Sequence, residues 1–216
     1  MKTRTASTII GLSTLALIGA AAPAASAAIT GVTGATTFLG SPPVSCTPGS
    51  LGGINAFAWD EQQGVSLSIV ADMTNNPGVS TSPVPGLVSG PLDSHFIHFD
   101  GIAGIPGASG TVTFNGQIVG CMITANGLDI TDGPAGASGT VYPTFFPFRG
   151  LATSIPSIIS INANTLTFNL NALSPINEVA QVRVFTRVPA PGATAAGLSL
   201  AGLTALRRRR PAASAG

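Results

Sequence analysis

The chain has 216 residues, of which 44% are hydrophobic and only 8% are charged, and once its two end segments are set aside its length suits a single domain. Six of the nine basic residues lie in those end segments, so the part between them has three arginines, eight acids, no lysine and a formal charge near −5. Because phosphate binding requires clustered cations, this balance argues against nucleic acid and anionic membrane surfaces as partners.

The first 27 residues are typical of a secretory signal peptide that forms a cleavable helix. Lys2 and Arg4 supply a basic start, Ile9 to Ile18 supply an apolar run, and Ala25-Ser26-Ala27 supplies a small-residue cleavage site. We expect export through the Sec translocon and removal of residues 1–27 by signal peptidase. The exported domain then spans residues 28–187.

The central part of the chain carries strand signals and little helical periodicity. Short alternating or β-branched runs separated by Gly, Pro, Asn and Asp favour an all-β domain, an antiparallel β-sandwich or jelly roll. Alternation is cleanest where Leu166, Phe168 and Leu170 are expected on the core face. The predicted strands are Thr33 to Leu39, Ala56 to Trp59, Val65 to Val70, His95 to Phe99, Thr111 to Phe114, Gln117 to Thr124, Ser157 to Ile161, Thr165 to Leu170 and Val179 to Thr186.

Turn chemistry predicts two of the connections. Asn115-Gly116 lies between two of these strands and indicates a hairpin with a type I′ turn. Asn75 to Pro91 contains four prolines and three glycines and is expected to be a long surface loop. The hexapeptide Gly107 to Val112 recurs as Gly136 to Val141. We interpret it as one loop-to-strand sequence used twice, because the residues between the copies do not match.

Cys46 and Cys121 are the two cysteines. An even number of cysteines in an exported chain usually pairs, so we predict a disulfide between them. A nucleophilic thiol is the alternative, and a zinc site would require both histidines to converge on the same cysteines.

The residues that could carry chemistry lie mostly between Asp93 and Asp132. In the predicted strand His95 to Phe99 the two histidines fall on opposite faces, which argues against a metal site that uses both. His98 with Asp100 would suit a general base and its orienting group, yet no serine stands in a Gly-x-Ser-x-Gly elbow. We therefore expect no catalytic residue and no enzyme.

Two further groups of polar residues have structural and functional interpretations. Asp129 and Asp132 lie in a glycine-containing turn and are weak candidates for calcium ligands, although capping of the turn is favoured and no metal or other cofactor is expected. Trp59 is followed by Asp60-Glu61, which indicates a solvated loop in which an exposed indole would suit a sugar. Arg149 is expected to pair with an acid and hold a loop.

The C-terminal segment has three parts. Val188-Pro189-Ala190-Pro191-Gly192 interrupts regular structure, Ala193 to Leu206 is uncharged, and Arg207-Arg208-Arg209-Arg210 closes the segment. As a helix the apolar part would be about 21 Å long, shorter than the roughly 30 Å hydrocarbon layer, but extension back through the Pro-Gly pair would lengthen it. The arginines would then stay on the cytoplasmic side. A core helix that ends in solvated arginines is the alternative.

This arrangement resembles the PEP-CTERM sorting signal, with Ala190 where that family usually carries Glu. The resemblance covers residues 188–210, and residues 211–216 form a short tail. It implies recognition and removal by an exosortase, a transpeptidase-like membrane enzyme, and export to the cell surface or extracellular matrix. The succession from Asp93 to Thr186 also resembles a body that recurs before such tails, which implies an exported β domain without a known activity.

Together these features predict a secreted or cell-surface protein of a Gram-negative-type bacterium, transiently anchored through its C-terminal helix. A non-enzymatic structural or adhesive role ranks first, with exopolysaccharide as a further candidate partner. The alternatives are a lectin-like module that binds calcium or carbohydrate, and a secreted hydrolase that uses His98 and Asp100 or paired carboxylates.

Overall fold

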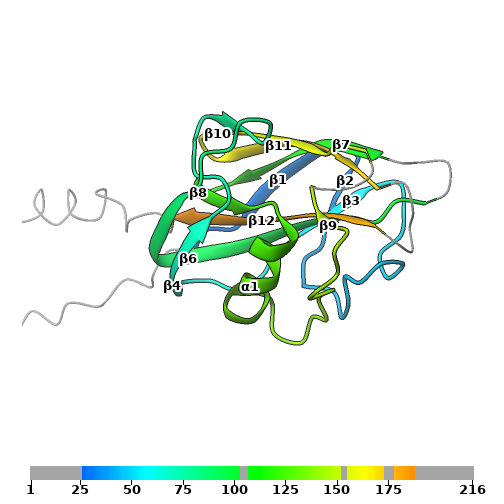
Figure 1. The fold of residues 1–216 in the computed structure, drawn as a ribbon, viewed down its shortest axis with the longest axis horizontal. Coiled ribbons are helices and arrows are strands. Elements are labelled where there is room, and N and C mark those ends of the chain that lie inside the picture. The colour runs from blue at the N-terminus through cyan, green and yellow to red at the C-terminus, as the bar shows by residue number, and fades with distance from the viewer. Residues whose placement is uncertain (1–25, 103–106, 152–154, 173–177, 188–216) are drawn as a thin grey trace, which may run out of the picture.

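The computed structural model describes residues 26–102, 107–151, 155–172 and 178–187. In this part of the chain, two β-sheets face one another and one helix covers the outer side of the second sheet (Figure 1). The prediction of a β-sandwich is therefore confirmed at the level of two packed sheets. The sorting motif, the hydrophobic segment and the arginine run lie outside the described residues, as does the signal peptide up to residue 25.

The first sheet has five strands and an alternating pattern. Side chains that point inward, including Leu166, Phe168 and Leu170, are buried as predicted, whereas Thr167 and Asn169 between them are exposed. The strands follow the order β1 (Ile29–Gly34), β7 (Gly107–Phe114), β11 (Thr165–Asn171), β10 (Ile158–Asn162) and β5 (Gly78–Val79).

The second sheet is built around two long antiparallel strands, β6 (Gly86–Phe99) and β12 (Val179–Arg187). Its main order is β2 (Thr36–Phe38), β3 (Ala56–Asp60), β6, β12 and β8 (Gln117–Met122). In addition, β4 (Val65–Ala71) pairs with β6 and the short β9 (Arg149–Gly150) pairs with β12.

Strand β6 begins inside the segment that was expected to be a surface loop. Residues 86–91 pair with β4 over the register from Ala71↔Gly86 to Ser66↔Pro91. Gly90 has φ +109°, a backbone conformation that residues with side chains rarely adopt, and it lies next to Pro91 within the strand. In residues 86–91 the many Pro and Gly residues therefore indicate a distorted strand and not a loop.

The prediction of a hairpin at Asn115-Gly116 is wrong, because β7 belongs to the first sheet and β8 to the second. The pair carries the chain from one sheet to the other, and neither residue has a positive φ. Asn115 Oδ1 accepts a hydrogen bond from the Ala28 amide at 2.6 Å. A Cβ on Gly116 would lie 2.6 Å from the Arg187 carbonyl oxygen, so close packing and not turn geometry requires glycine here.

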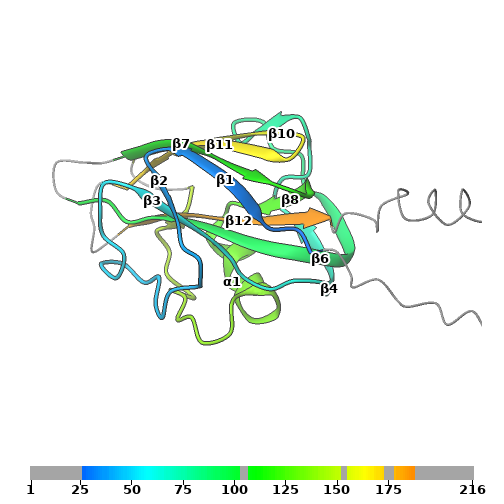
Figure 2. The same cartoon turned by 180° about the vertical axis from the view of Figure 1, so that it is seen from behind.

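Two hydrophobic clusters lie on opposite faces of the second sheet. The cluster between the sheets includes Phe114, Val182 and Cys121. The cluster on the outer face includes Trp59 and Cys46. Residues 61–64 form the predicted loop after β3, but Trp59 itself is fully buried, so the expectation of an exposed indole is wrong. Figure 2 shows the same layers from behind, with the first sheet and the helix on opposite sides of the second sheet.

The predicted disulfide is also wrong, because the two cysteines lie on opposite faces of the second sheet. Cys46 and Cys121 are both free and buried, and the second sheet separates the two clusters to which they belong. Burial raises the pKa of the Cys46 thiol to about 12 and also raises the pKa of Cys121, so both thiols stay protonated and act as small apolar side chains.

The helix α1 (Ala125–Ala135) replaces the predicted turn around Asp129 and Asp132. Thr124 caps it by accepting a hydrogen bond from the Gly127 amide at 3.0 Å. Asp72 Oδ2 accepts from the Ile123 amide at 2.8 Å and from the amide and hydroxyl of Thr124 at 2.9 Å. Among the described residues, no helix is long and apolar enough to cross a membrane.

Candidate functional site

The largest set of ionisable side chains in mutual contact, within the described part of the chain, lies between the second sheet and α1. We call it the arginine cluster. Asp132 joins its two halves, because one carboxylate contacts both guanidinium groups. The cluster consists of Glu61, Asp129, Asp132, Arg149 and Arg183.

Arg183 projects from β12 and is fully buried. Its Nε and Nη2 donate to Glu61 Oε2 and Oε1 at 2.7 and 3.0 Å, and Nη2 also donates to Asp132 Oδ1 at 3.1 Å. Its Nη1 donates to Thr131 Oγ1 at 2.7 Å and to the Leu128 carbonyl at 3.2 Å. All five N–H groups of the guanidinium are thus engaged, as burial of this charge requires.

Aromatic rings and carboxylates complete the surroundings of Arg183. Its Cζ atom lies 4.9 Å from the ring centre of Phe96 and 5.2 Å from that of Tyr142. Burial lowers the pKa of Arg183, but the negative charges of Glu61 and Asp132 outweigh burial and raise the pKa overall. Burial and Glu61 likewise raise the pKa of the Tyr142 hydroxyl, which donates a hydrogen bond to Glu61.

Arg149 holds the other half of the cluster, and its predicted pairing with an acid is confirmed. Its Nη1 donates to Asp129 Oδ1 and to Asp132 Oδ2, each at 2.7 Å. Because the two aspartates are three positions apart on α1, both face this guanidinium. A bound cation is already present in the form of arginine, so Asp129 and Asp132 do not make an open calcium site. No group of three or more His, Cys, Asp or Glu residues suited to a metal occurs within the described residues.

Arg149 also determines the state of His98. Its Nε donates to Gln181 Oε1 at 2.9 Å, which fixes the amide so that Gln181 Nε2 donates to His98 Nδ1 at 3.0 Å. The ring is therefore the neutral tautomer with its proton on Nε2. Burial, with a smaller contribution from Arg149, lowers the pKa of His98 to about 3.

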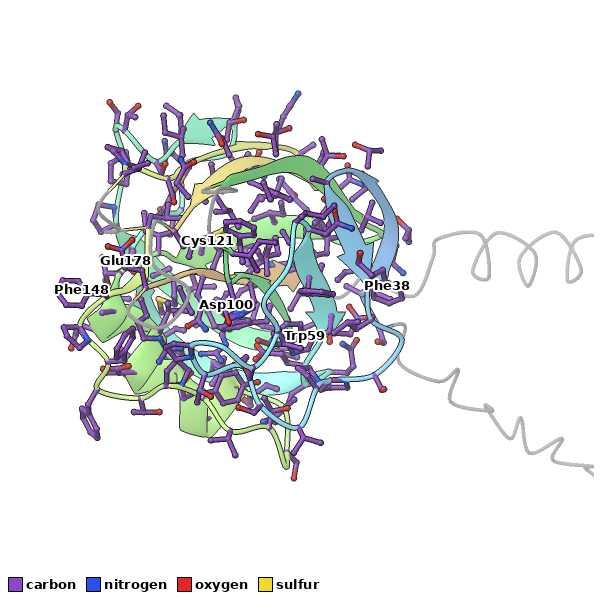
Figure 3. The ribbon with its side chains drawn as sticks, turned by 90° about the vertical axis from the view of Figure 1, so that its right-hand side faces the viewer. Phe38, Trp59, Asp100, Cys121, Phe148 and Glu178 are labelled. Carbon is purple, nitrogen blue, oxygen red and sulfur yellow. The ribbon has the colours of Figure 1, made fainter. Side chains whose placement is uncertain are left out.

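His98 and Asp100 do not form the base and orienting group suggested by their spacing. Asp100 Oδ2 accepts from the Gly49 amide at 2.6 Å, and burial raises the pKa of Asp100 to about 6. His98 Nε2, Asp100 Oδ1 and Trp59 Nε1 are buried and make no hydrogen bond to the residues that the structure describes. Figure 3 shows Trp59 and Asp100 in the interior, whereas Phe148 lies at the periphery.

The other histidine belongs to a hydrogen-bonded chain that sequence reasoning missed. His95 Nδ1 lies 2.6 Å from Asp60 Oδ1, and its Nε2 lies 2.9 Å from Thr186 Oγ1. The order carboxylate, imidazole, hydroxyl matches that of a nucleophilic triad. Both His95 and Thr186 are fully buried, so the chain crosslinks β3, β6 and β12 inside the fold and gives a substrate no access. Only the alternation of β6, which directs the two histidines to opposite faces, was available from the sequence.

The surface differs sharply from this charged interior. Every acidic residue is buried or half-buried, and Arg187 is the single exposed charged residue in the part of the chain that the structure describes. The five strands of the first sheet contain no charged residue at all. The solvent-facing surface is therefore made almost entirely of uncharged groups.

The outer face of the first sheet presents mainly hydroxyl and amide groups, with Ile158 as an exposed apolar member, and we call it the hydroxyl face. Strand register aligns its side chains across β1, β7, β11 and β10. Thr33 Oγ1 and Thr111 Oγ1 are 2.7 Å apart, and Ser109 Oγ donates to Asn169 Oδ1 at 3.2 Å. Its members are Thr33, Ser109, Thr111, Thr113, Ser160, Asn162, Thr165, Thr167 and Asn169, all exposed or half-buried.

No protein-family model, curated protein or solved structure matches the chain. The sorting residues Val188-Pro189-Ala190-Pro191-Gly192 and the run Arg207 to Arg210 lie outside the described residues. The function is therefore argued from the described sites and from the sequence of the two ends.

Removal of the Arg183 side chain should destabilise the fold strongly. In Arg183→Met, Glu61 remains buried without its cationic partner and Asp132 keeps only Arg149, and we expect a loss of about 3–5 kcal/mol in the free energy of unfolding. Urea denaturation of the variant measures this loss. Arg187→Met on the same strand is the matched control, because Arg187 is exposed, and it should change stability by less than about 0.5 kcal/mol. Equal effects of the two substitutions would contradict a structural role for the cluster.

The two buried groups His98 and Asp100 should give opposite pH dependences. The folded-state pKa of His98, about 3, lies below its ordinary 6.5, so stability falls as pH decreases through this range because the unfolded chain takes up the proton. The folded-state pKa of Asp100, about 6, lies above its ordinary 3.8, so its contribution to stability rises as pH decreases.

Comparison of unfolding free energies at about pH 7 and about pH 4.5 separates the two groups. His98→Gln should lose less stability than the parent protein on acidification, and Asp100→Asn should lose more. Identical losses in all three proteins would show that neither group has the shifted pKa.

Proposed function

We propose that this chain is an exported structural or adhesive protein of the cell surface or extracellular matrix of a Gram-negative-type bacterium. The observation that carries the proposal is the uncharged surface of the domain, with the hydroxyl face as its largest ordered part. The acids and two of the three arginines of the domain are engaged or buried inside the fold, where they hold the protein together.

An uncharged, hydroxyl-rich face suits a matrix of neutral polysaccharide. Surface charge keeps proteins apart, so its absence favours close association with an uncharged surface. Hydroxyl and amide groups both donate and accept hydrogen bonds, which makes them complementary to sugar hydroxyls of any orientation. The pairing of Thr33 with Thr111 and of Ser109 with Asn169 limits the rotamer freedom that would be lost on binding.

The two ends of the sequence support delivery to this location. We propose export through the Sec translocon, transient anchoring by Ala193 to Leu206, and recognition of Val188-Pro189-Ala190-Pro191-Gly192 by an exosortase-type transpeptidase. The run Arg207 to Arg210 would hold the anchor on the cytoplasmic side until the tail is removed.

A carbohydrate-binding, lectin-like module is the second candidate, and the hydroxyl face supports it as well. We do not propose calcium-dependent binding, because the expected calcium ligands Asp129 and Asp132 are engaged by Arg149. We propose no catalytic role, since the carboxylate, imidazole and hydroxyl groups that are joined in a chain are buried.

Binding to an insoluble neutral polysaccharide tests the proposed role of the hydroxyl face. Thr111→Asp/Thr167→Asp places two charges on adjacent strands of this face, in register with one another. We expect retention of the protein on microcrystalline cellulose to weaken about tenfold or more, equivalent to about 1.4 kcal/mol. Sedimentation of protein with the polysaccharide gives the bound fraction.

The matched control is Ser66→Asp/Ser68→Asp on β4, where both serines are exposed in the second sheet. This variant adds the same charge away from the hydroxyl face and should bind like the parent protein. Equal weakening by both variants, or no binding by the parent protein to any neutral polysaccharide, would count against the proposal.

Mass spectrometry of the protein from the cells that make it tests the sorting proposal. We expect the mature form to lack Ala193 to Arg210. Replacement of Pro189 and Pro191 by alanine should leave the tail attached, because the helix-interrupting motif is then lost. A mature protein that retains the tail would contradict processing by an exosortase.

A further inference from the structure

Asp93 is a fully buried carboxylate near the end of the sandwich where the described chain begins. Its Oδ1 accepts from the Gly64 amide at 2.6 Å and its Oδ2 accepts from the Ala27 amide. Within the described residues it forms no ion pair, unlike the acids of the arginine cluster. A buried carboxylate held by two neutral amides is costly, because its charge is not compensated.

Ala27 is an integral part of the fold. Its side chain is fully buried, and its Cβ would lie 2.7 Å from a Cβ built on Gly116, which shows how tightly it is enclosed. Two residues later, the Ile29 amide donates to Asp60 Oδ1 at 3.1 Å and starts the first sheet. Removal of Ala27 with the signal peptide would leave Asp93 Oδ2 buried without a donor.

The preceding peptide bond, between Ser26 and Ala27, has the features of a cleavage site. Ser26 and Ala24 are the small residues at the last and third-last positions before it, as signal peptidase requires. Ser26 is exposed, whereas Ala27 is buried, so the boundary of the fold falls at this bond. A cut here would convert the Ala27 amide nitrogen into an α-ammonium without moving it away from Asp93.

We propose that the signal peptide is removed between Ser26 and Ala27, and that the new α-ammonium of Ala27 forms an ion pair with the buried Asp93 carboxylate. This inference rests on the proposed export of the chain. In the hydrolysis, water supplies the hydroxyl of the new Ser26 carboxyl group and a proton for the new amine. The amine takes a further proton from solvent, since its ordinary pKa is about 8.

The ion pair between Ala27 and Asp93 would make removal of the signal peptide stabilise the fold. A charged donor makes a stronger hydrogen bond to a carboxylate than a neutral amide does, and it compensates the buried charge. Asp60, which accepts from Ile29, adds a second negative group near the same segment. The mature domain would therefore be more stable than the precursor, and folding would be completed by removal of the signal.

Three chains that differ only in the position at which they begin test the proposed site. The chain through Gly216 is made as a fusion whose N-terminal partner is removed by its own protease, to leave Ala24, Ala27 or Ala28 first. We expect the Ala27 form to melt about 4 °C or more above the Ala24 form, and the Ala28 form to melt below both. In Asp93→Asn, the advantage of Ala27 over Ala24 should disappear.

Asp72→Asn is the matched control, because Asp72 also accepts backbone hydrogen bonds but binds the start of α1. It should lower the melting temperature of all three forms equally. Equal melting of the Ala24 and Ala27 forms, or an Ala27 advantage that survives Asp93→Asn, would overturn the ion pair.

Determination of the N-terminal residue of the protein isolated from its producing cells is the second experiment. Ala27 is expected, and Ala28 or any residue before Ala27 would overturn the proposed cleavage position. A chain that keeps its whole signal segment would contradict export itself, and the melting comparison would still decide whether Asp93 binds an α-ammonium.

Discussion

The fold depends on compensating two guanidinium groups that the second sheet buries on its outer face. Arg183 and Arg149 come from neighbouring strands, β12 and β9, and neither reaches solvent. Burial of such a charge is tolerated only when its donors are all engaged, so Glu61 and two aspartates of α1 must lie where they do. The helix has two internal glycines and Pro134, a poor sequence for a helix, and it is held by these bonds and by the buried Leu128.

The same compensation determines what the protein offers to other molecules. Carboxylates that bind arginine are not free to bind calcium. His98 is a poor base at neutral pH, because its Nδ1 accepts a hydrogen bond from Gln181 and its pKa is only about 3. The charged groups are thus mostly internal, and the outer face of the first sheet presents threonine, serine and asparagine without any charge. This arrangement is the basis on which we propose contact with a neutral matrix.

The beginning and the end of the described chain meet at one place. A Cβ on Gly116 would approach both the Arg187 carbonyl oxygen and the Cβ of Ala27, so the two ends of the domain are packed side by side. The signal removal and tail removal that we propose would therefore act on one edge of the domain, and Asp93 would link the first of these events to the stability of the fold.

Local alternation in the sequence determined most strands and their buried faces, because burial of every second side chain is a property of each segment alone. Alternation also predicted that the two histidines diverge, whereas the pairing of Arg149 with an acid was predicted because Arg149 is the one cation in the middle of the chain. Tertiary structure decided the rest. Gly107 to Val112 is a strand paired with β11, whereas the identical Gly136 to Val141 follows α1 as turns around Tyr142. The helix, the crossing at Asn115-Gly116 and the separation of Cys46 from Cys121 depend on partners distant in sequence, whose contacts no local pattern encodes.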